Sequence, residues 1–186
     1  MQIRPATLAD LDAVREIDGT IEATDYLHLD QSGEGLARSW RLERRPAREK
    51  LIEPNRLADA SHFLAKQILS GGDEGIVLLA EHDQAIVAAL IAHQRPQRGT
   101  LHIVDLRVDY DFRRQGLGLA LVYQTIQHAR DNKLRAVSAH TLTSNVPAAA
   151  LLAKCGFDLC GADTRRLSNH DVVKESATLF WYAALD

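Results

Sequence analysis

Apolar residues recur along this chain at two spacings, and each spacing predicts a different kind of element. Where they recur every three or four positions, one face of a helix is apolar; these segments are residues 8–17, 55–69, 119–130 and 147–154. Where they form short runs bounded by turn residues, a strand is predicted; these segments are residues 2–4, 76–80, 85–93, 101–109, 136–141, 157–163 and 177–183.

The order of these segments predicts the fold class. Along the chain it reads β-α-α-β-β-β-α-β-α-β-β, which is typical of a mixed α/β (α+β) domain with one central sheet. We expect a single domain over residues 1–186, with Thr7 capping the first helix and Gly156 ending the last. Residues 19–54 stay unassigned, because Tyr26-Leu27-His28-Leu29 is followed by a charge-rich block that prolines interrupt.

Charge and composition narrow the classes of function. With 22 Lys and Arg against 25 Asp and Glu, the net charge is −3, which argues against a nucleic-acid-binding protein driven by bulk electrostatics. The N-terminus lacks the apolar core of a signal peptide, and no apolar run is long enough to span a bilayer. Cys155 and Cys160 are too few for a disulfide scaffold, so we expect a cytoplasmic protein without membrane partners. No set of His, Cys, Asp and Glu shows metal-ligand spacing, so no metal is expected.

The strand at 101–109 and the helix after it are joined by Arg113-Arg114-Gln115-Gly116-Leu117-Gly118. Glycines let the backbone approach a ligand closely, and the free amides at a helix start bind anions. Two arginines add positive charge that favours phosphate groups. The loop therefore predicts a site for a multiply charged anion, best a pyrophosphate; the structural alternative is a solvated basic patch beside Asp109 and Asp111.

This Arg-x-x-Gly-x-Gly pattern after the central strand resembles the GNAT superfamily of acetyl-CoA-dependent N-acetyltransferases. A second segment, Asn145-Val-Pro-Ala-Ala-Ala-Leu-Leu-Ala-Lys-Cys-Gly-Phe157, resembles that superfamily's Asn-x-x-Ala-x-x-Leu-Tyr-x-Lys-x-Gly-Phe segment, and it is also similar to streptothricin acetyltransferases. The resemblance covers essentially the whole chain. It implies a central, mostly antiparallel sheet of six to seven strands, flanked by about four helices and splayed between the fourth and fifth strands, with acetyl-CoA as the acyl donor.

The resemblance also implies where acetyl-CoA binds. The main chain of Leu106, Arg107 and Val108 would hydrogen-bond the pantetheine arm. The amides of the loop would wrap the pyrophosphate; they belong to Arg113, Arg114, Gln115, Gly116, Leu117 and Gly118. The Asn145 side chain would contact the lower pantetheine; the alternative is a cap for the following helix, and one side chain can do both.

Acyl transfer to an amine needs a neutral nucleophile, which a general base near pH 7 can supply. His102 occupies the strand position where related enzymes carry a catalytic glutamate, and an imidazole suits this task. By strand parity His102 shares a face with Val108, while Asp105, our second candidate base, lies on the opposite face unless a bulge resets the register. The alternative is a histidine that only packs or hydrogen-bonds.

The superfamily's usual tyrosine, the proton donor to the departing thiolate, falls at Leu152 in this chain. Leucine has no proton to donate, so Tyr123, Tyr182 or water would take this role. Of these, Tyr182 is our catalytic candidate. A thiolate is a tolerable leaving group, so the change need not abolish turnover. It also leaves open a non-catalytic acyl-CoA-binding module with a degenerate site.

The acceptor is the least defined part of the prediction. In this fold the acceptor lies between the early helices and the late strands, which here means residues 19–54 and 163–176. Carboxylates and aromatic rings in these segments suit a cationic amine, and our candidates for acceptor binding are Tyr26 and His140. The acceptor is a small molecule or, alternatively, a protein or aminoacyl group. An arginine block at 41–48 leaves an acidic partner or a homodimer open.

Overall fold

The computed structural model describes residues 1–185, which form two compact units that are each discontinuous in sequence. Unit 1 contains residues 1–20 and 54–139 and the chain from Tyr182 on. Unit 2 contains residues 21–53 and 140–181. The chain thus passes from one unit to the other after Thr20, Glu53, Ala139 and Trp181.

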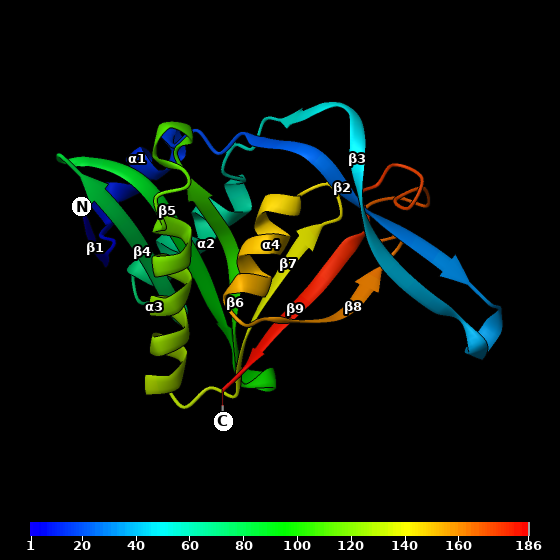
Figure 1. Ribbon diagram of the computed structural model, residues 1–186. Helices are drawn as coiled ribbons and strands as arrows, with labels where there is room; N and C mark the ends of the chain where they lie inside the picture. Colours follow the sequence, from blue (N-terminus) through cyan, green and yellow to red (C-terminus); the bar gives the residue numbers. More distant parts are fainter. Residues whose placement is uncertain (186) are drawn as a thin grey trace. The chain divides into compact units, whose positions relative to one another are not determined.

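Unit 1 is built on antiparallel strands with helices on their faces (Figure 1). Its elements are β1 (Gln2–Pro5), a 3₁₀ turn (Leu8–Asp10), α1 (Leu11–Glu16), α2 (Asp59–Leu69), β4 (Gly75–His82), β5 (Ala85–Arg95), β6 (Thr100–Val108) and α3 (Leu117–Asp131). Strand β4 pairs with β1 and β5, and β5 pairs with β6, all antiparallel. The start of β7 (Ala136–Leu142) then pairs with β6 in parallel.

The central strands of unit 1 are apolar on both faces, which explains the unbroken apolar runs in the sequence. Val77 on β4 and Ile91 on β5 lie directly opposite each other and belong to a buried cluster with Val14 of α1 and Ala65 of α2. Alternate residues such as Leu90 point to the other face, and α3 contacts β4, β5 and β6. The sheet is therefore covered on both sides within this unit.

Unit 2 contains the segment that the sequence left unassigned. Residues 19–54 are mostly a long antiparallel ribbon of β2 (Ile21–Ser32) and β3 (Ser39–Glu53) (Figure 1). The unit also holds α4 (Val146–Lys154), β8 (Asp158–Asp163) and most of β9 (Thr178–Ala184). The ribbon is joined to the rest of the unit where the Leu27 amide donates to the Thr143 carbonyl at 2.9 Å.

The strand order confirms the predicted fold class. A seven-stranded sheet runs β1-β4-β5-β6-β7-β9-β8, and the ribbon forms a separate two-stranded sheet. Two predicted helix starts are wrong. Residues 8–10 form a 3₁₀ turn before α1. Residues 55–58 lie outside any helix or strand, with Leu57 buried in the core before α2 begins at Asp59.

Candidate functional site

Strand β6 carries a β-bulge in the middle of the predicted cofactor segment. On β5, Ile91 pairs with Asp105, but the next β5 residue pairs with Ile103. Val104 is therefore an extra residue with no partner of its own, and such a bulge changes which face the following side chains point to.

The bulge overturns the parity prediction for β6. Directly opposite residues in an antiparallel pair point to the same face. Asp105 lies opposite Ile91, which belongs to the core against α1 and α2, and His102 lies opposite His93, two residues further along β5. Val108 pairs with a β5 residue of the other face. His102 therefore shares a face with Asp105 and not with Val108, the reverse of the expected arrangement.

Asp105 forms a buried ion pair with Arg107, a contact that the sequence analysis missed. The Nε and Nη2 atoms of Arg107 donate to the two carboxylate oxygens of Asp105 at 2.7 and 2.8 Å. The side chain of Arg107 is 0% exposed and that of Asp105 is 14% exposed. Arg107 also donates to the carbonyl of Asn55. Both carboxylate oxygens of Asp105 are therefore already occupied by hydrogen bonds from Arg107.

His102 is buried, with 6% of its surface exposed. Its Nδ1 atom lies 3.0 Å from the hydroxyl oxygen of Ser138, the residue directly opposite it on β7. A hydrogen bond between neighbouring strands fixes the orientation of the imidazole ring. The predicted base is thus a rigidly held side chain.

Strands β6 and β7 pair over only part of their length. The ladder joins Thr100–Ile103 to residues 136–139 and ends there, whereas β6 continues to Val108. The main chain of Leu106, Arg107 and Val108 lies beyond the end of this ladder. This position agrees with the expected splay between the fourth and fifth predicted strands.

The loop after β6 has the backbone that the glycines predicted. Gly116 is the N-cap of α3 with φ of 85°, and Arg114 also has a positive φ, of 61°. A Cβ built on Gly116 would meet nothing within 4 Å, so the space beside this backbone is open. The helix that follows has 15 residues, and its first amides and its dipole favour an anion at this end.

Arg113 has a different role from the one expected for its side chain. Its guanidinium donates to the carbonyls of Val108 and Asp18 at 3.0 and 3.1 Å, and it lies over the Tyr110 ring. These contacts hold the loop against the end of β6. Arg113 therefore shapes the loop, while Arg114 remains the arginine of the predicted anion site.

In unit 2, the second predicted motif forms the start of α4. The side-chain oxygen of Asn145 accepts from the Ala148 amide at 3.1 Å, which confirms the helix-cap alternative. Leu152, at the position of the usual tyrosine, is 4% exposed and belongs to the apolar core. His140 packs edge-on against Phe180, with ring centroids 4.7 Å apart. Tyr182 is half-buried on β9, in the part of this strand that belongs to unit 1.

The two acceptor segments named from the sequence meet within unit 2. Nδ1 of His28 on β2 lies 2.9 Å from a carboxylate oxygen of Glu175 in the loop before β9. The Tyr26 ring contacts the His28 ring edge-on, at 6.4 Å between centroids. Both residues belong to the two segments that the sequence indicated for the acceptor, but their contact was not predicted, because residues 147 positions apart leave no local signal.

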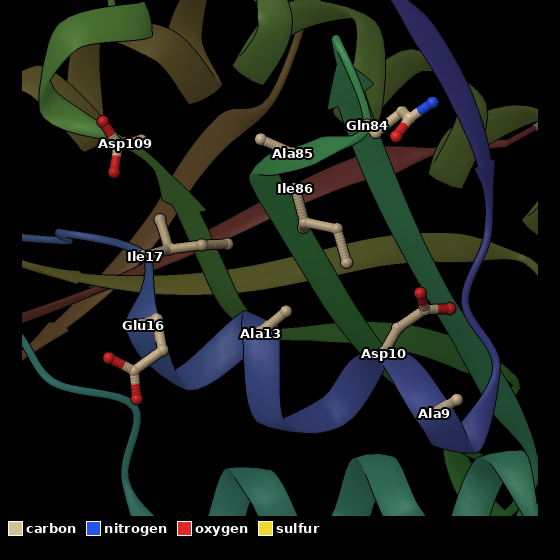
Figure 2. Close-up of a pocket in the computed structure, with 9 residues that line it drawn as sticks. All are labelled: Ala9, Asp10, Ala13, Glu16, Ile17, Gln84, Ala85, Ile86 and Asp109. Carbon is tan, nitrogen blue, oxygen red and sulfur yellow. The ribbon is translucent and has the colours of Figure 1, made fainter.

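A shallow groove of about 470 Å³ lies in unit 1 between α1 and the β4–β5 turn (Figure 2). Its walls carry the carboxylates of Asp10, Glu16 and Asp109 and the small side chains of Ala13 and Ala85. No predicted site residue lines it.

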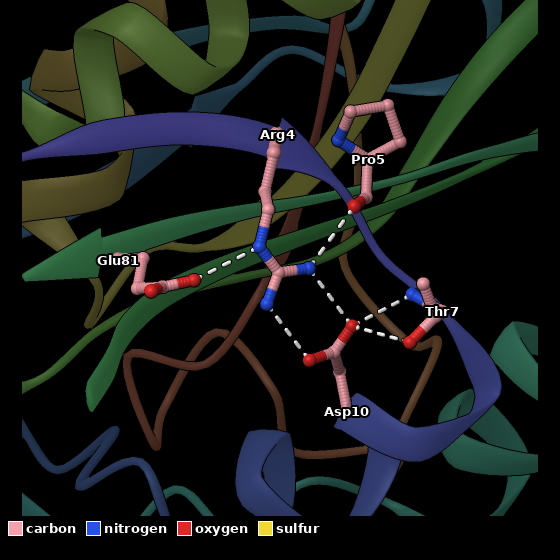
Figure 3. A network of polar contacts seen from close by, with 5 residues as sticks. All are labelled: Arg4, Pro5, Thr7, Asp10 and Glu81. Atoms are coloured by element: carbon pink, nitrogen blue, oxygen red, sulfur yellow. Dashed lines mark hydrogen bonds and ion pairs between the residues drawn. The ribbon is translucent and has the colours of Figure 1, made fainter. Parts of the chain in front are cut away.

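Asp10 is also the centre of a polar network at the start of unit 1 (Figure 3). Arg4 donates to both oxygens of Asp10 at 2.9 Å and to Glu81 at 2.9 Å, and the Thr7 amide and hydroxyl donate to Asp10. The hydrogen bonds from Arg4 hold the pKa of Asp10 far below its usual value of 3.8. The same contacts raise the pKa of Arg4.

Within residues 1–185, no group of three or more His, Cys, Asp and Glu side chains is arranged to hold a metal ion. No helix in that range is long and apolar enough to cross a membrane. Cys155 and Cys160 are free thiols, the first buried and the second exposed.

Two known proteins resemble part of this sequence. Streptothricin acetyltransferase A of Bacillus subtilis is 34% identical over 80 residues, and the streptothricin acetyltransferase of Escherichia coli is 33% identical over 81 residues. These matches cover 43% and 44% of this chain, and 46% and 45% of the relatives. The similarity thus spans about half the length of the curated relatives.

Solved structures resemble the whole fold. A nourseothricin acetyltransferase superposes with a TM-score of 0.79 at 19% identity, covering 100% of this chain and 98% of that one. A candidate streptothricin acetyltransferase from Bacillus anthracis, solved in complex with acetyl coenzyme A, gives 0.77 at 22% identity and covers 99% of both chains. At these identities the likeness concerns the fold.

The family model of the GNAT acetyltransferases matches residues 37–157, which is more than half of the chain and includes β6, the Gly116 loop and α4. The chain therefore belongs to the GNAT acetyltransferase family.

Proposed function

We propose that this protein is an N-acetyltransferase that moves an acetyl group from acetyl-CoA to a primary amine. The main support for the proposal is the start of α3. There Gly116 leaves open space beside the backbone, next to the first amides of the helix, which suit the pyrophosphate of acetyl-CoA. The acetyl-CoA complex of the relative from Bacillus anthracis supports this choice of donor.

The residues of unit 1 fit a donor of this kind. The amides of Gly116, Leu117 and Gly118, with Arg114, would hold the pyrophosphate, because helix amides and a guanidinium both suit phosphate oxygens. The main chain of β6 from Leu106 to Val108 would hold the pantetheine. When bound, acetyl-CoA supplies the acetyl group as a thioester, which is already activated toward an amine.

His102 is the proposed proton acceptor. An alkylammonium has a pKa of about 10.4 in water, so the acceptor must lose a proton before its nitrogen attacks. The contact with Ser138 keeps the imidazole in one orientation. The amine attacks directly in a ternary complex, and water or Tyr182 protonates the departing thiolate because Leu152 cannot.

The acceptor is proposed to be a cationic small molecule with a primary amine, approached by Tyr26 and His140. The streptothricin acetyltransferase relatives support this class over a protein or aminoacyl acceptor. We place the protein in the cytoplasm, a location that its two free cysteines favour.

Two observations favour a second function, an acyl-CoA-binding module that does not transfer the acetyl group. Leu152 is part of the core and His102 is buried, so the chain has neither an exposed base on β6 nor the usual acid on α4. A chain of this kind could bind acyl-CoA without transferring the acetyl group.

Release of free thiol from acetyl-CoA with a panel of amines separates the two functions. Transfer to at least one primary amine, with mass spectrometry showing the acetylated product, supports the enzyme. Binding of acetyl-CoA without any product supports the binding module. Neither binding nor transfer would contradict both.

His102→Gln tests the base in the same assay. We expect kcat to fall about 100-fold and the acidic limb of the pH–rate profile to disappear, since general base catalysis contributes about 10²–10⁴-fold. An unchanged rate and profile would show that His102 only packs against Ser138.

A further inference from the structure

The loop between β8 and β9 in unit 2 is ordered by hydrogen bonds of its own. Asp171 is fully buried there, and its carboxylate accepts from the Leu167 amide and the Ser168 hydroxyl at 2.8 and 2.7 Å. Burial opposes the ionisation of Asp171, but these hydrogen bonds prevail and its pKa lies below the usual value. The Ser176 amide donates back to the Asp171 carbonyl, which closes the loop just after Glu175.

Glu175 lies at the end of a turn in a strained backbone conformation. Its φ is 52°, in the left-handed region that residues other than glycine rarely adopt and that costs about 1–2 kcal/mol. In this conformation the side chain reaches His28 on the ribbon. Strain of this kind at a polar side chain is a reason to look for a functional role.

Thr143 fixes the register between this loop and the ribbon. Its carbonyl accepts from the Leu27 amide, between Tyr26 and His28, and its own amide donates to the Ala177 carbonyl, two residues after Glu175. One residue therefore sets the positions of both partners of the His28–Glu175 pair.

Glu175 has a different kind of partner from three carboxylates of the ribbon that form ion pairs. Glu22 pairs with Lys50, Asp25 with Arg44 and Glu43 with Arg45, so each of these carboxylates has a cation of its own. Glu175 is held by a histidine, which can donate a hydrogen bond in its neutral form and so orient a carboxylate without cancelling its charge.

The pair is also within reach of a ligand. The side chains of His28 and Glu175 are 25% and 26% exposed, and the half-buried ring of Tyr26 lies against His28. A carboxylate beside an aromatic ring is suited to an alkylammonium group, through a charge-assisted hydrogen bond and contact with the ring.

We propose that Glu175, held by His28 beside Tyr26, binds a second ammonium group of the acceptor, one that is not itself acetylated. The preferred acceptor is then a diamine or polyamine and not a monoamine. This inference rests on the proposed transfer reaction for its biological meaning, but the binding site itself is defined within unit 2.

The test measures binding of two probes to the full chain by calorimetry, 1,5-diaminopentane and 1-aminopentane, with CoA present. We expect the unmodified protein to bind the diamine more tightly, and Glu175→Gln to weaken the diamine about 10-fold or more while changing the monoamine less than about twofold. The matched control is Glu22→Gln, which removes a carboxylate of the same ribbon, six residues from His28 along β2, that Lys50 already neutralises. It should change neither affinity.

A second variant, Glu175→Gly, distinguishes loss of the carboxylate from loss of the folded loop. Glycine accepts the positive φ of this position without strain, so the variant should unfold at the same temperature or higher and still lose the diamine preference. The KM for acetyl-CoA should stay unchanged in both Glu175 variants, because the donor residues are untouched.

Three results would overturn the proposal. They are no preference of the unmodified protein for the diamine, an equal loss for both amines in Glu175→Gln, or an effect of Glu22→Gln as large as that of Glu175→Gln. Because calorimetry measures binding directly, the test of the ammonium site remains valid even if the protein acetylates no amine. Acetyl transfer with no diamine preference would leave the proposed function standing and remove the subsite.

Discussion

Gly116 is the residue at which the backbone passes from loop to helix through a conformation that side chains disfavour. Its φ of 85° allows α3 to start directly after the loop, and the space where a Cβ would stand is open. The sequence predicted this role, because a glycine between an apolar strand and an apolar helical face is typical of a turn with a positive φ.

Gly116→Ala should cost about 1 kcal/mol of unfolding free energy and weaken acetyl-CoA binding. Gly71→Ala is the control, because Gly71 has a φ of 76° with the same open surroundings in a turn after α2. Both variants should lose similar stability by chemical denaturation. Only Gly116→Ala should raise the Kd for acetyl-CoA, and an equal rise in the control would place the anion elsewhere.

Asp10 makes part of the stability of unit 1 depend on pH. Because Arg4 lowers the pKa of Asp10 in the folded chain below its usual value of 3.8, this stabilisation is complete above about pH 4. It is lost as the pH falls and Asp10 becomes protonated. Asp10→Asn should therefore unfold more easily than the unmodified protein at pH 7.

The difference between these two proteins should shrink steadily below pH 4, as urea denaturation at several pH values would reveal. A difference that stayed constant down to pH 2 would mean that Asp10 acts by packing and not by charge.

Among the elements, β6 is a strand whose position the sequence predicted well, but whose side chains it assigned to the wrong faces of the sheet. Its bounds differ by one residue from the prediction, but the bulge at Val104 reverses the parity of everything after it. A bulge depends on the pairing with β5, which no local pattern of β6 reveals. The Asp105–Arg107 pair did have a local signal, because residues two apart on a strand share a face with or without the bulge. Its burial depends on the packing around β6, which the local pattern does not reveal.

Arg107→Met should destabilise the chain by about 3–5 kcal/mol, because Asp105 would keep a largely buried charge without a partner. The double variant with Asp105→Asn should recover much of that loss. Denaturation of both variants measures this coupling directly. Equal losses in the single and double variants would instead assign the effect to the packing of the Arg107 side chain.

The β2–β3 ribbon was missed for a different physical reason. Its strands carry charges on both faces, such as Arg44 opposite Leu27 and Glu43 opposite His28, so the alternation that marks a strand is weak. A four-residue irregularity on β3 after Pro46 interrupts it further. The ribbon depends on the pairing of β2 with β3 and on the hydrogen bond from Leu27 to Thr143. A local sequence pattern does not reveal pairing of this kind.

For the whole molecule, family membership and the backbone at the start of α3 predict that acetyl-CoA stabilises the folded chain. If acetyl-CoA binds only the folded chain, a concentration 100 times its Kd should add about 2.7 kcal/mol to the unfolding free energy. For a chain of this length the melting temperature would rise by about 5–10 °C. Differential scanning fluorimetry with acetyl-CoA measures the shift, and adenosine, which lacks the pyrophosphate, is the control.

The interleaving of the two units in sequence has a consequence for how the protein is made. The chain enters unit 2 after Thr20, leaves it after Glu53 and returns after Ala139, so each unit waits for residues that are translated late. The last of these, Leu185, donates its amide to the carbonyl of Arg135 inside unit 1. Neither unit can therefore finish folding until the residues that follow Ala139 have been synthesised. A chain that stops before these residues would leave both units incomplete, however stable each unit is once it has formed.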